Sequence, residues 1–197
     1  MRSLAILLLL VAASPVLMAQ SAPSAYEANH GLWAGAEFSD FNPDYSCGNS
    51  NFPLSCTNDL LGFGVKADYH FGQRLQAMGE ARWLPWNGAQ GQTESSYLIG
   101  PAYRIWSRNA FALSGKLLAG IGQISVPGLS GTYFAYAPGA DFNYHYSPRI
   151  SLFVDYEYQR WPSFAGPPTI SSSGQVTLHN HGLSPNGFSI GAMYRFF

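Results

Sequence analysis

Two carboxylates stand two residues apart in ISLFVDYEYQ, where Asp155 and Glu157 fall on the same side of an alternating segment. Paired carboxylates can work as a general acid and a general base. A second set, His181 and Ser184 in HNHGLSPN, has the residue types of a nucleophile and its base. No carboxylate follows Glu157 in the chain, and His179 with His181 supplies only two ligands to a metal. We therefore predict no catalytic residue, no metal site and no cofactor.

The two cysteines, Cys47 and Cys56, lie in the polar stretch CGNSNFPLSC with eight residues between them. In an exported protein, an even pair of cysteines within one loop predicts a local disulfide bond. A redox or metal-binding pair fits less well, because the spacing is not C-x-x-C and no histidine or third cysteine is nearby.

The N-terminal residues predict export. Arg2 is followed by an apolar run over residues 4–11 and by small residues up to Ala19, which is the layout of a cleaved secretory signal. The run is shorter than the roughly 20 apolar residues that a membrane-spanning helix needs. No later stretch is continuously apolar over such a length.

The composition is poor in charge and rich in aromatic residues. Charged residues make up 11% of the chain and aromatic residues 15%, and the net charge is −1. An ordinary soluble domain has about 25% charged residues. A chain without a basic patch is not expected to bind nucleic acid.

Eight segments alternate apolar and polar residues with a period of two, which is typical of half-buried strands. They cover residues 31–41, 60–71, 74–84, 97–106, 111–122, 134–145, 150–159 and 187–196. Short turns at 72–73, 107–109 and 146–149 alternate with longer stretches of Gly, Pro, Asn and Ser at about 40–59, 85–95, 126–132 and 162–186. This alternation predicts an up-and-down sheet that closes on itself and has two unlike ends.

The two faces of the segments decide between a soluble calyx and a membrane barrel, because both have the same period. On one face, single charges alternate with Gly, Ala and Ser, which would solvate an exterior poorly but fit a narrow interior. The other face has aromatic residues near both strand ends and aliphatic residues between them, as in the aromatic girdles of membrane barrels. We predict an all-β, eight-stranded antiparallel transmembrane barrel.

This pattern, with the aromatic segment Tyr194-Arg195-Phe196, resembles the small OmpA/OmpX-type outer-membrane barrels of Gram-negative bacteria. The resemblance implies an outer-membrane location, with the short turns and both termini on the periplasmic side. It also implies that the barrel assembly machinery recognises Tyr194 and Phe196, or the additional Phe197. We expect a signal peptide at 1–19, a short periplasmic segment at 20–30 and the barrel at 31–197.

The inward face of such a barrel would hold six acids and five bases. They are Glu37, Asp68, Glu80, Asp141, Asp155 and Glu157, with Lys66, Arg82, Arg104, Lys116 and Arg195. An eight-stranded barrel is only wide enough for side chains to fill its interior. We therefore expect a charge network that plugs the interior and fixes the strand register, with a narrow gated pore as the alternative.

The long loops are where a partner would bind. Tyr45 and Phe52 in the first loop, with Trp161 and Phe164 in the fourth, would either dock a ligand or pack against the rim of the barrel. We expect a structural or surface-interaction role without catalysis.

The expected partners are outer-membrane lipid, lipopolysaccharide and an extracellular ligand. An alternative is a lipid-modifying enzyme, because HNHGLSPN, with His181 and Ser184, is similar to the Ser/His/acid set of lipid A deacylase barrels. We expect a monomer, since a closed barrel has no strand edge that needs a neighbour.

Overall fold

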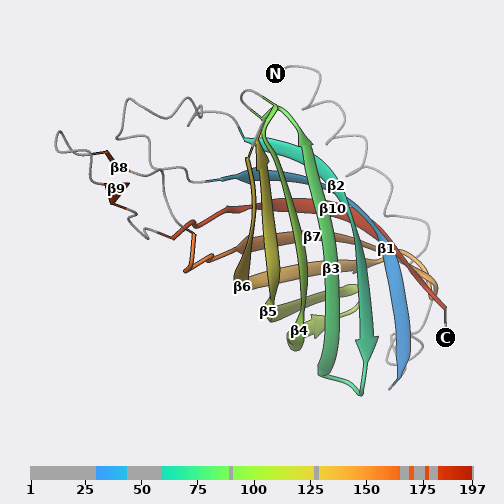
Figure 1. Ribbon diagram of the computed structural model, residues 1–197. Coiled ribbons are helices and arrows are strands. Elements are labelled where there is room, and N and C mark those ends of the chain that lie inside the picture. Colours follow the sequence, from blue (N-terminus) through green and yellow to red (C-terminus); the bar gives the residue numbers. More distant parts are fainter. Residues whose placement is uncertain are drawn as a thin grey trace.

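The computed structural model describes residues 30–43, 59–88, 91–126, 129–164, 169–170, 176–177 and 182–196. Eight of its ten strands form one closed antiparallel barrel in the order β1-β10-β7-β6-β5-β4-β3-β2 (Figure 1). They are β1 (Gly31–Asn42), β2 (Leu60–His70), β3 (Leu75–Trp86), β4 (Thr93–Arg108), β5 (Phe111–Val126), β6 (Leu129–His145), β7 (Ile150–Tyr158) and β10 (Asn186–Arg195). The predicted fold class is confirmed. In the described residues, no helix is long and apolar enough to cross a membrane.

The barrel closes between its first and last strands. β1 pairs with β10 from Trp33↔Arg195 to Asn42↔Asn186, and β10 pairs with β7 on its other side. In hydrocarbon each backbone N–H and C=O group must be paired within the protein. Closure therefore gives the aromatic C-terminal strand a partner along both edges.

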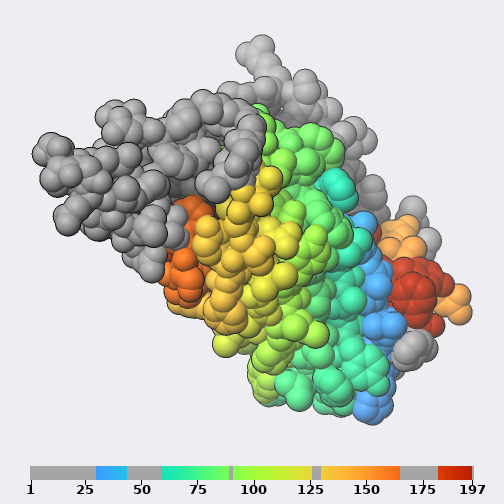
Figure 2. Space-filling model, viewed as in Figure 1, coloured from blue at the N-terminus to red at the C-terminus, as the bar shows by residue number. Residues whose placement is uncertain are grey.

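Side chains alternate between the interior and the outer face of the barrel. In β2, Val65 is 49% exposed, whereas Lys66 beside it is 1% exposed. Outward apolar side chains such as Ile99 on β4, at 70%, form the surface that would contact lipid. In the space-filling view, the side chains of β2 to β6 form a continuous wall on this side of the barrel (Figure 2). The inward and outward faces thus follow the period of two that the sequence predicted.

Three strands are several residues longer than the sequence pattern predicted. β4, β5 and β6 have 16, 16 and 17 residues. The predicted long loop at 126–132 is wrong, because β5 and β6 stay paired up to Val126↔Leu129. Ser130 and Gly131 are small or polar, which hid the alternation in the sequence, but the backbone pairing continues through both residues.

The two ends of the barrel differ. At the short-turn end, residues 71–74, 109–110 and 146–149 connect neighbouring strands, and β1 begins and β10 ends there. Asn109 in the second turn has a φ of 54°, a left-handed conformation that asparagine tolerates. The long-loop end has the other connections. The connection after β7 contains a small separate pair of strands, β8 (Thr169–Ile170) and β9 (Val176–Thr177) (Figure 1).

Candidate functional site

The centre of the barrel interior holds two lysines surrounded by carboxylates. Lys66 Nζ, from β2, lies 2.9 Å from Asp155, 3.0 Å from Asp141 and 3.5 Å from Glu80. Lys116 Nζ, from β5 on the other side of the barrel, lies 2.7 Å from Glu80 and 2.8 Å from Asp155. Glu80 and Asp155 therefore bridge two lysines that are 50 residues apart in the chain.

Arg82 extends this group of charges towards the long-loop end. Its guanidinium lies 3.0 Å from Glu37, 3.0 Å from Glu157 and 3.3 Å from Glu80. Glu157 also accepts a hydrogen bond from Lys116 Nζ at 2.7 Å. We call these eight side chains the central network: Glu37, Lys66, Glu80, Arg82, Lys116, Asp141, Asp155 and Glu157. All are at most 5% exposed.

Strand register places these charges opposite one another. Lys66 on β2 is directly paired with Glu80 on β3, and Asp141 on β6 with Asp155 on β7. Like charges directly opposite each other destabilise a sheet. Lys66 offsets the repulsion between Asp141 and Asp155, because its Nζ lies within 3.0 Å of both carboxylates.

Glycines make room for the long charged side chains. A Cβ on Gly64 would lie 2.6 Å from Glu37 Oε1, and a Cβ on Gly139 would lie 2.7 Å from Lys116 Cε. Each glycine is thus in contact with a member of the central network on a neighbouring strand. This packing explains why small residues alternate with charges on the inward face.

The structure brings together eight of the eleven predicted lumen charges and separates the other three. Asp68 lies near the short-turn end, where its carboxylate is 3.2 Å from His70 Nε2. Arg104 lies beside the same histidine, with Nη2 3.3 Å from His70 Nδ1. Arg195 stacks over the Trp33 ring at 5.9 Å. These three charges lie apart from the central network, because β2, β4 and β10 place them nearer the short-turn end.

Asp68 and Arg104 line a small cavity near the short-turn end. The lining residues include Trp33, Asp68, His70, Arg104 and His145, and the cavity volume is about 10 Å³. That is about the smallest volume that holds one water molecule. This cavity therefore has room for about one water molecule.

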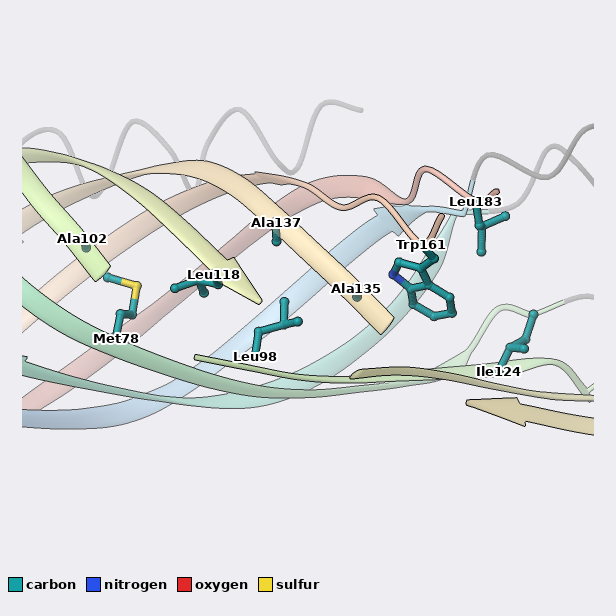
Figure 3. Packing of buried hydrophobic residues seen from close by; sticks show 9 residues of the cluster. All are labelled: Met78, Leu98, Ala102, Leu118, Ile124, Ala135, Ala137, Trp161 and Leu183. Carbon is teal, nitrogen blue, oxygen red and sulfur yellow. The ribbon is translucent and has the colours of Figure 1, made fainter. Parts of the chain in front are cut away.

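A cluster of buried apolar residues runs along the interior to the long-loop end. Figure 3 shows it running from Met78 and Ala102 along the barrel to Trp161, Leu183 and Ile124. Trp161 Nε1 donates to Gln159 Oε1 at 2.8 Å, and Gln159 Nε2 donates to Glu157 Oε1 at 2.7 Å. A polar chain thus joins the tryptophan to the central network.

Trp161 and Phe164 were candidates for either ligand docking or rim packing, and their positions match packing. Trp161 is 1% exposed, and a Cβ on Gly122 would clash with its ring, so the indole fits against this glycine of β5. The backbone N–H of Trp161 donates to the carbonyl oxygen of Leu183, and the N–H of Leu183 donates to the carbonyl oxygen of Trp161. These bonds bend the chain after β7 across the barrel mouth. Phe164 packs against Tyr133, with ring centroids 5.1 Å apart.

Sequence reasoning missed Glu94, which is 3% exposed on β4. The sequence pattern places this residue in a loop, because the predicted strand begins at Tyr97. Its place in the alternation could have indicated burial, because Glu94 lies two residues before Ser96 and four before Leu98, and both of these are buried.

Ser184 is 6% exposed, and its Oγ accepts a hydrogen bond from Arg160 Nη1 at 2.7 Å. A nucleophile on the outer surface would need an exposed hydroxyl, so this position does not favour the deacylase-like alternative. Within the described ranges, no three His, Cys, Asp or Glu side chains are arranged to hold a metal ion. The remaining candidates lie outside the described residues: Tyr45, Cys47, Phe52, Cys56, His179, His181 and Phe197.

The aromatic residues of the last strand lie on the outer face. Tyr194 is 43% exposed and Phe196 is 61% exposed, and their rings meet edge to face at 5.4 Å. Both side chains are thus accessible from outside the barrel, as recognition during assembly would require.

A family model described as "Outer membrane protein beta-barrel domain" matches residues 5–196. Among solved structures, Neisserial surface protein A is similar with a TM-score of 0.57 at 15% identity, over 84% of this chain and 97% of that chain. The outer membrane protein OprG from Pseudomonas aeruginosa is similar with a TM-score of 0.54 at 13% identity, over 87% of this chain and 97% of that chain. No curated protein matches the sequence. Since the family match spans nearly the whole chain, the protein belongs to the outer-membrane β-barrel family of Gram-negative bacteria.

Proposed function

We propose that this outer-membrane barrel is closed to ions and acts at the cell surface through the connections at its long-loop end. The observation that supports closure is the central network, in which three cations and five carboxylates reach across the barrel from β1, β2, β3, β5, β6 and β7. Ions would have to displace buried, paired charges to pass. Breaking such a pair by removing one partner costs about 3–5 kcal/mol.

Three layers oppose conduction in series. The first is Trp161 with its apolar neighbours, the second is the central network, and the third is the group around His70 and Arg104. A current through the barrel requires a path through every layer. We therefore favour a closed barrel over a gated pore.

Single-channel recording in planar bilayers tests the closure. We expect no current from the wild-type protein or from the charge-balanced variant Arg82→Ala/Glu157→Ala, because two layers remain in that variant. Adding Trp161→Ala to this variant disrupts both the apolar layer and the central network, so we expect brief channel openings. Heat-dependent gel migration should verify that each variant is folded. A steady current through wild-type protein would refute the proposed closure.

The proposed surface role is supported by the unequal ends of the barrel. The connections 43–59 and 159–185 are much longer than the turns at the other end. Partner-binding residues are concentrated in such loops on a rigid scaffold. Asn42 Nδ2 donates to Asp59 Oδ1 at 3.1 Å, so the two ends of the first loop lie close together.

Because the two ends of the first loop lie close together, the loop can be deleted without separating β1 from β2. Replacing residues 44–58 by a short Gly-Asn linker should leave the barrel folded and reduce adherence of cells that carry the protein to epithelial monolayers. Replacing the turn at 71–74 by a linker serves as the matched control. Unchanged adherence after the loop deletion would contradict the surface role without affecting the closure.

A further inference from the structure

A repeated arrangement of arginine and tyrosine lies on the outside of the short-turn end. Arg74 immediately precedes β3, whose first residue, Leu75, pairs with Tyr103 on β4. Arg74 Nη1 donates to the Tyr103 hydroxyl at 3.1 Å. The backbone N of Arg104 donates to the carbonyl oxygen of Arg74 at 2.8 Å, which fixes the position of the turn.

The same arrangement recurs between β7 and β10. Arg149 immediately precedes Ile150, the first residue of β7, which pairs with Tyr194 on β10. Arg149 Nη1 lies 3.4 Å from the Tyr194 hydroxyl, to which it donates. The backbone N of Arg195 donates to the carbonyl oxygen of Arg149 at 2.8 Å. Two distant parts of the sequence thus build one geometry, which we call the Arg–Tyr pair.

The paired strands β5 and β6 have this backbone geometry at the short-turn end without the arginine. Ala110 immediately precedes Phe111, which pairs with Tyr144, and the backbone N of His145 donates to the carbonyl oxygen of Ala110 at 2.8 Å. The backbone contacts therefore do not require an arginine. The arginine side chain at the other two positions calls for an explanation other than turn geometry.

The chemistry of the pair suits a phosphate group. Both arginines are exposed, and Tyr103 and Tyr194 are 48% and 43% exposed on the outer face. A guanidinium has five N–H donors in a planar fork that matches phosphate geometry. The bond to the tyrosine uses one of these donors and holds the group beside the barrel wall. The tyrosine hydroxyl keeps its own hydrogen to donate to a second phosphate oxygen.

The distribution of charge also favours an anion at this end. In the described part of the chain, the exposed acidic side chains are Asp40 and Asp59, and both lie at the long-loop end. Apolar side chains adjoin each pair on the outer face, with Leu75 51% exposed beside Arg74 and Leu152 42% exposed on β7. An exposed apolar surface next to a cationic group matches the acyl chain and the headgroup of a lipid.

We propose that each Arg–Tyr pair binds the phosphodiester headgroup of an anionic glycerophospholipid. Short turns face the periplasm in outer-membrane barrels, on the side of the leaflet that is built from glycerophospholipids. A basic residue near an anionic lipid surface contributes about 1 kcal/mol, or about fivefold in affinity. Lipid A also has phosphates, but it belongs to the opposite leaflet, at the long-loop end.

Native mass spectrometry of the full, folded protein tests the proposal. The protein is released from non-ionic detergent micelles containing either phosphatidylglycerol or lipid A. We expect up to two retained phosphatidylglycerol molecules on the wild type, mostly one on Arg74→Gln or Arg149→Gln, and mostly none on the double variant. Each single substitution should weaken retention about fivefold. Tyr103→Phe should also weaken retention at its pair.

Two matched variants separate the Arg–Tyr pair from general charge. Arg108, at the end of β4, is exposed at the same end but lies outside the repeated arrangement, so Arg108→Gln should leave both lipids bound. Ala110→Arg places the missing arginine beside Tyr144 and should add a third lipid. Equal retention by the wild type and the double variant, an equal loss in Arg108→Gln, or stronger retention of lipid A would overturn the proposal. Heat-dependent gel migration identifies folded variants.

Discussion

Replacing Lys116 with methionine is the most direct perturbation of the central network. Lys116 Nζ lies 2.7 Å from Glu80, 2.8 Å from Asp155 and 2.7 Å from Glu157. Methionine fills a similar volume but has no charge and no N–H donor. The substitution therefore leaves three buried carboxylates with one cation fewer.

The expected loss follows from the burial of the site. The lysine is 5% exposed and the three carboxylates are at most 5% exposed, so solvent cannot replace the lost partner. Removing one partner from a buried ion pair costs about 3–5 kcal/mol. The remaining cations, Lys66 and Arg82, already contact Glu80, so we expect the loss to lie within this range and not above it.

Urea unfolding of the protein in phospholipid vesicles, followed by tryptophan fluorescence, measures this loss. Arg108→Met is the matched control, because Arg108 is exposed and surface substitutions change stability by about 0.5 kcal/mol or less. The double variant Lys116→Met/Glu80→Gln restores the charge balance and should recover part of the stability. A loss under about 1 kcal/mol for Lys116→Met, well below the range expected for a broken buried ion pair, would refute the reasoning.

Three other predictions concern different parts of the barrel. Trp161→Ala should lower the free energy of unfolding by about 3–5 kcal/mol, because it empties a buried site; a change near zero in urea unfolding would contradict the observed packing. Ile99→Arg, midway along β4, should cost about 2–4 kcal/mol in vesicles and Ile105→Arg, near the short-turn end, about 0–1 kcal/mol; equal costs would argue against a lipid-facing wall. Alkylation followed by mass spectrometry should label Cys47 and Cys56 only after reduction, and labelling without reductant would exclude the predicted disulfide bond.

Much of the fold could be predicted from the sequence because the period of two is local. Successive side chains of a strand point to opposite faces, so the alternation from Val65 to Asp68 showed which residues face outward and which face inward. The scarcity of charge and the aromatic residues at both strand ends then indicated lipid outside. Strand ends were less predictable, as Glu94 and the paired stretch at 126–132 illustrate, because small and polar residues continue a strand without an apolar signal.

From the alternation in the sequence, Lys66, Lys116 and Asp155 could be placed on the inward face, but the partner of each charge could not be predicted. That depends on the register of strands that are far apart in the chain and on the closure of β1 against β10. Only the tertiary structure therefore separates Arg104 from the central network. It alone places Trp161 against Gly122, because the chain after β7 bends back through bonds between backbone groups, which no side-chain pattern records.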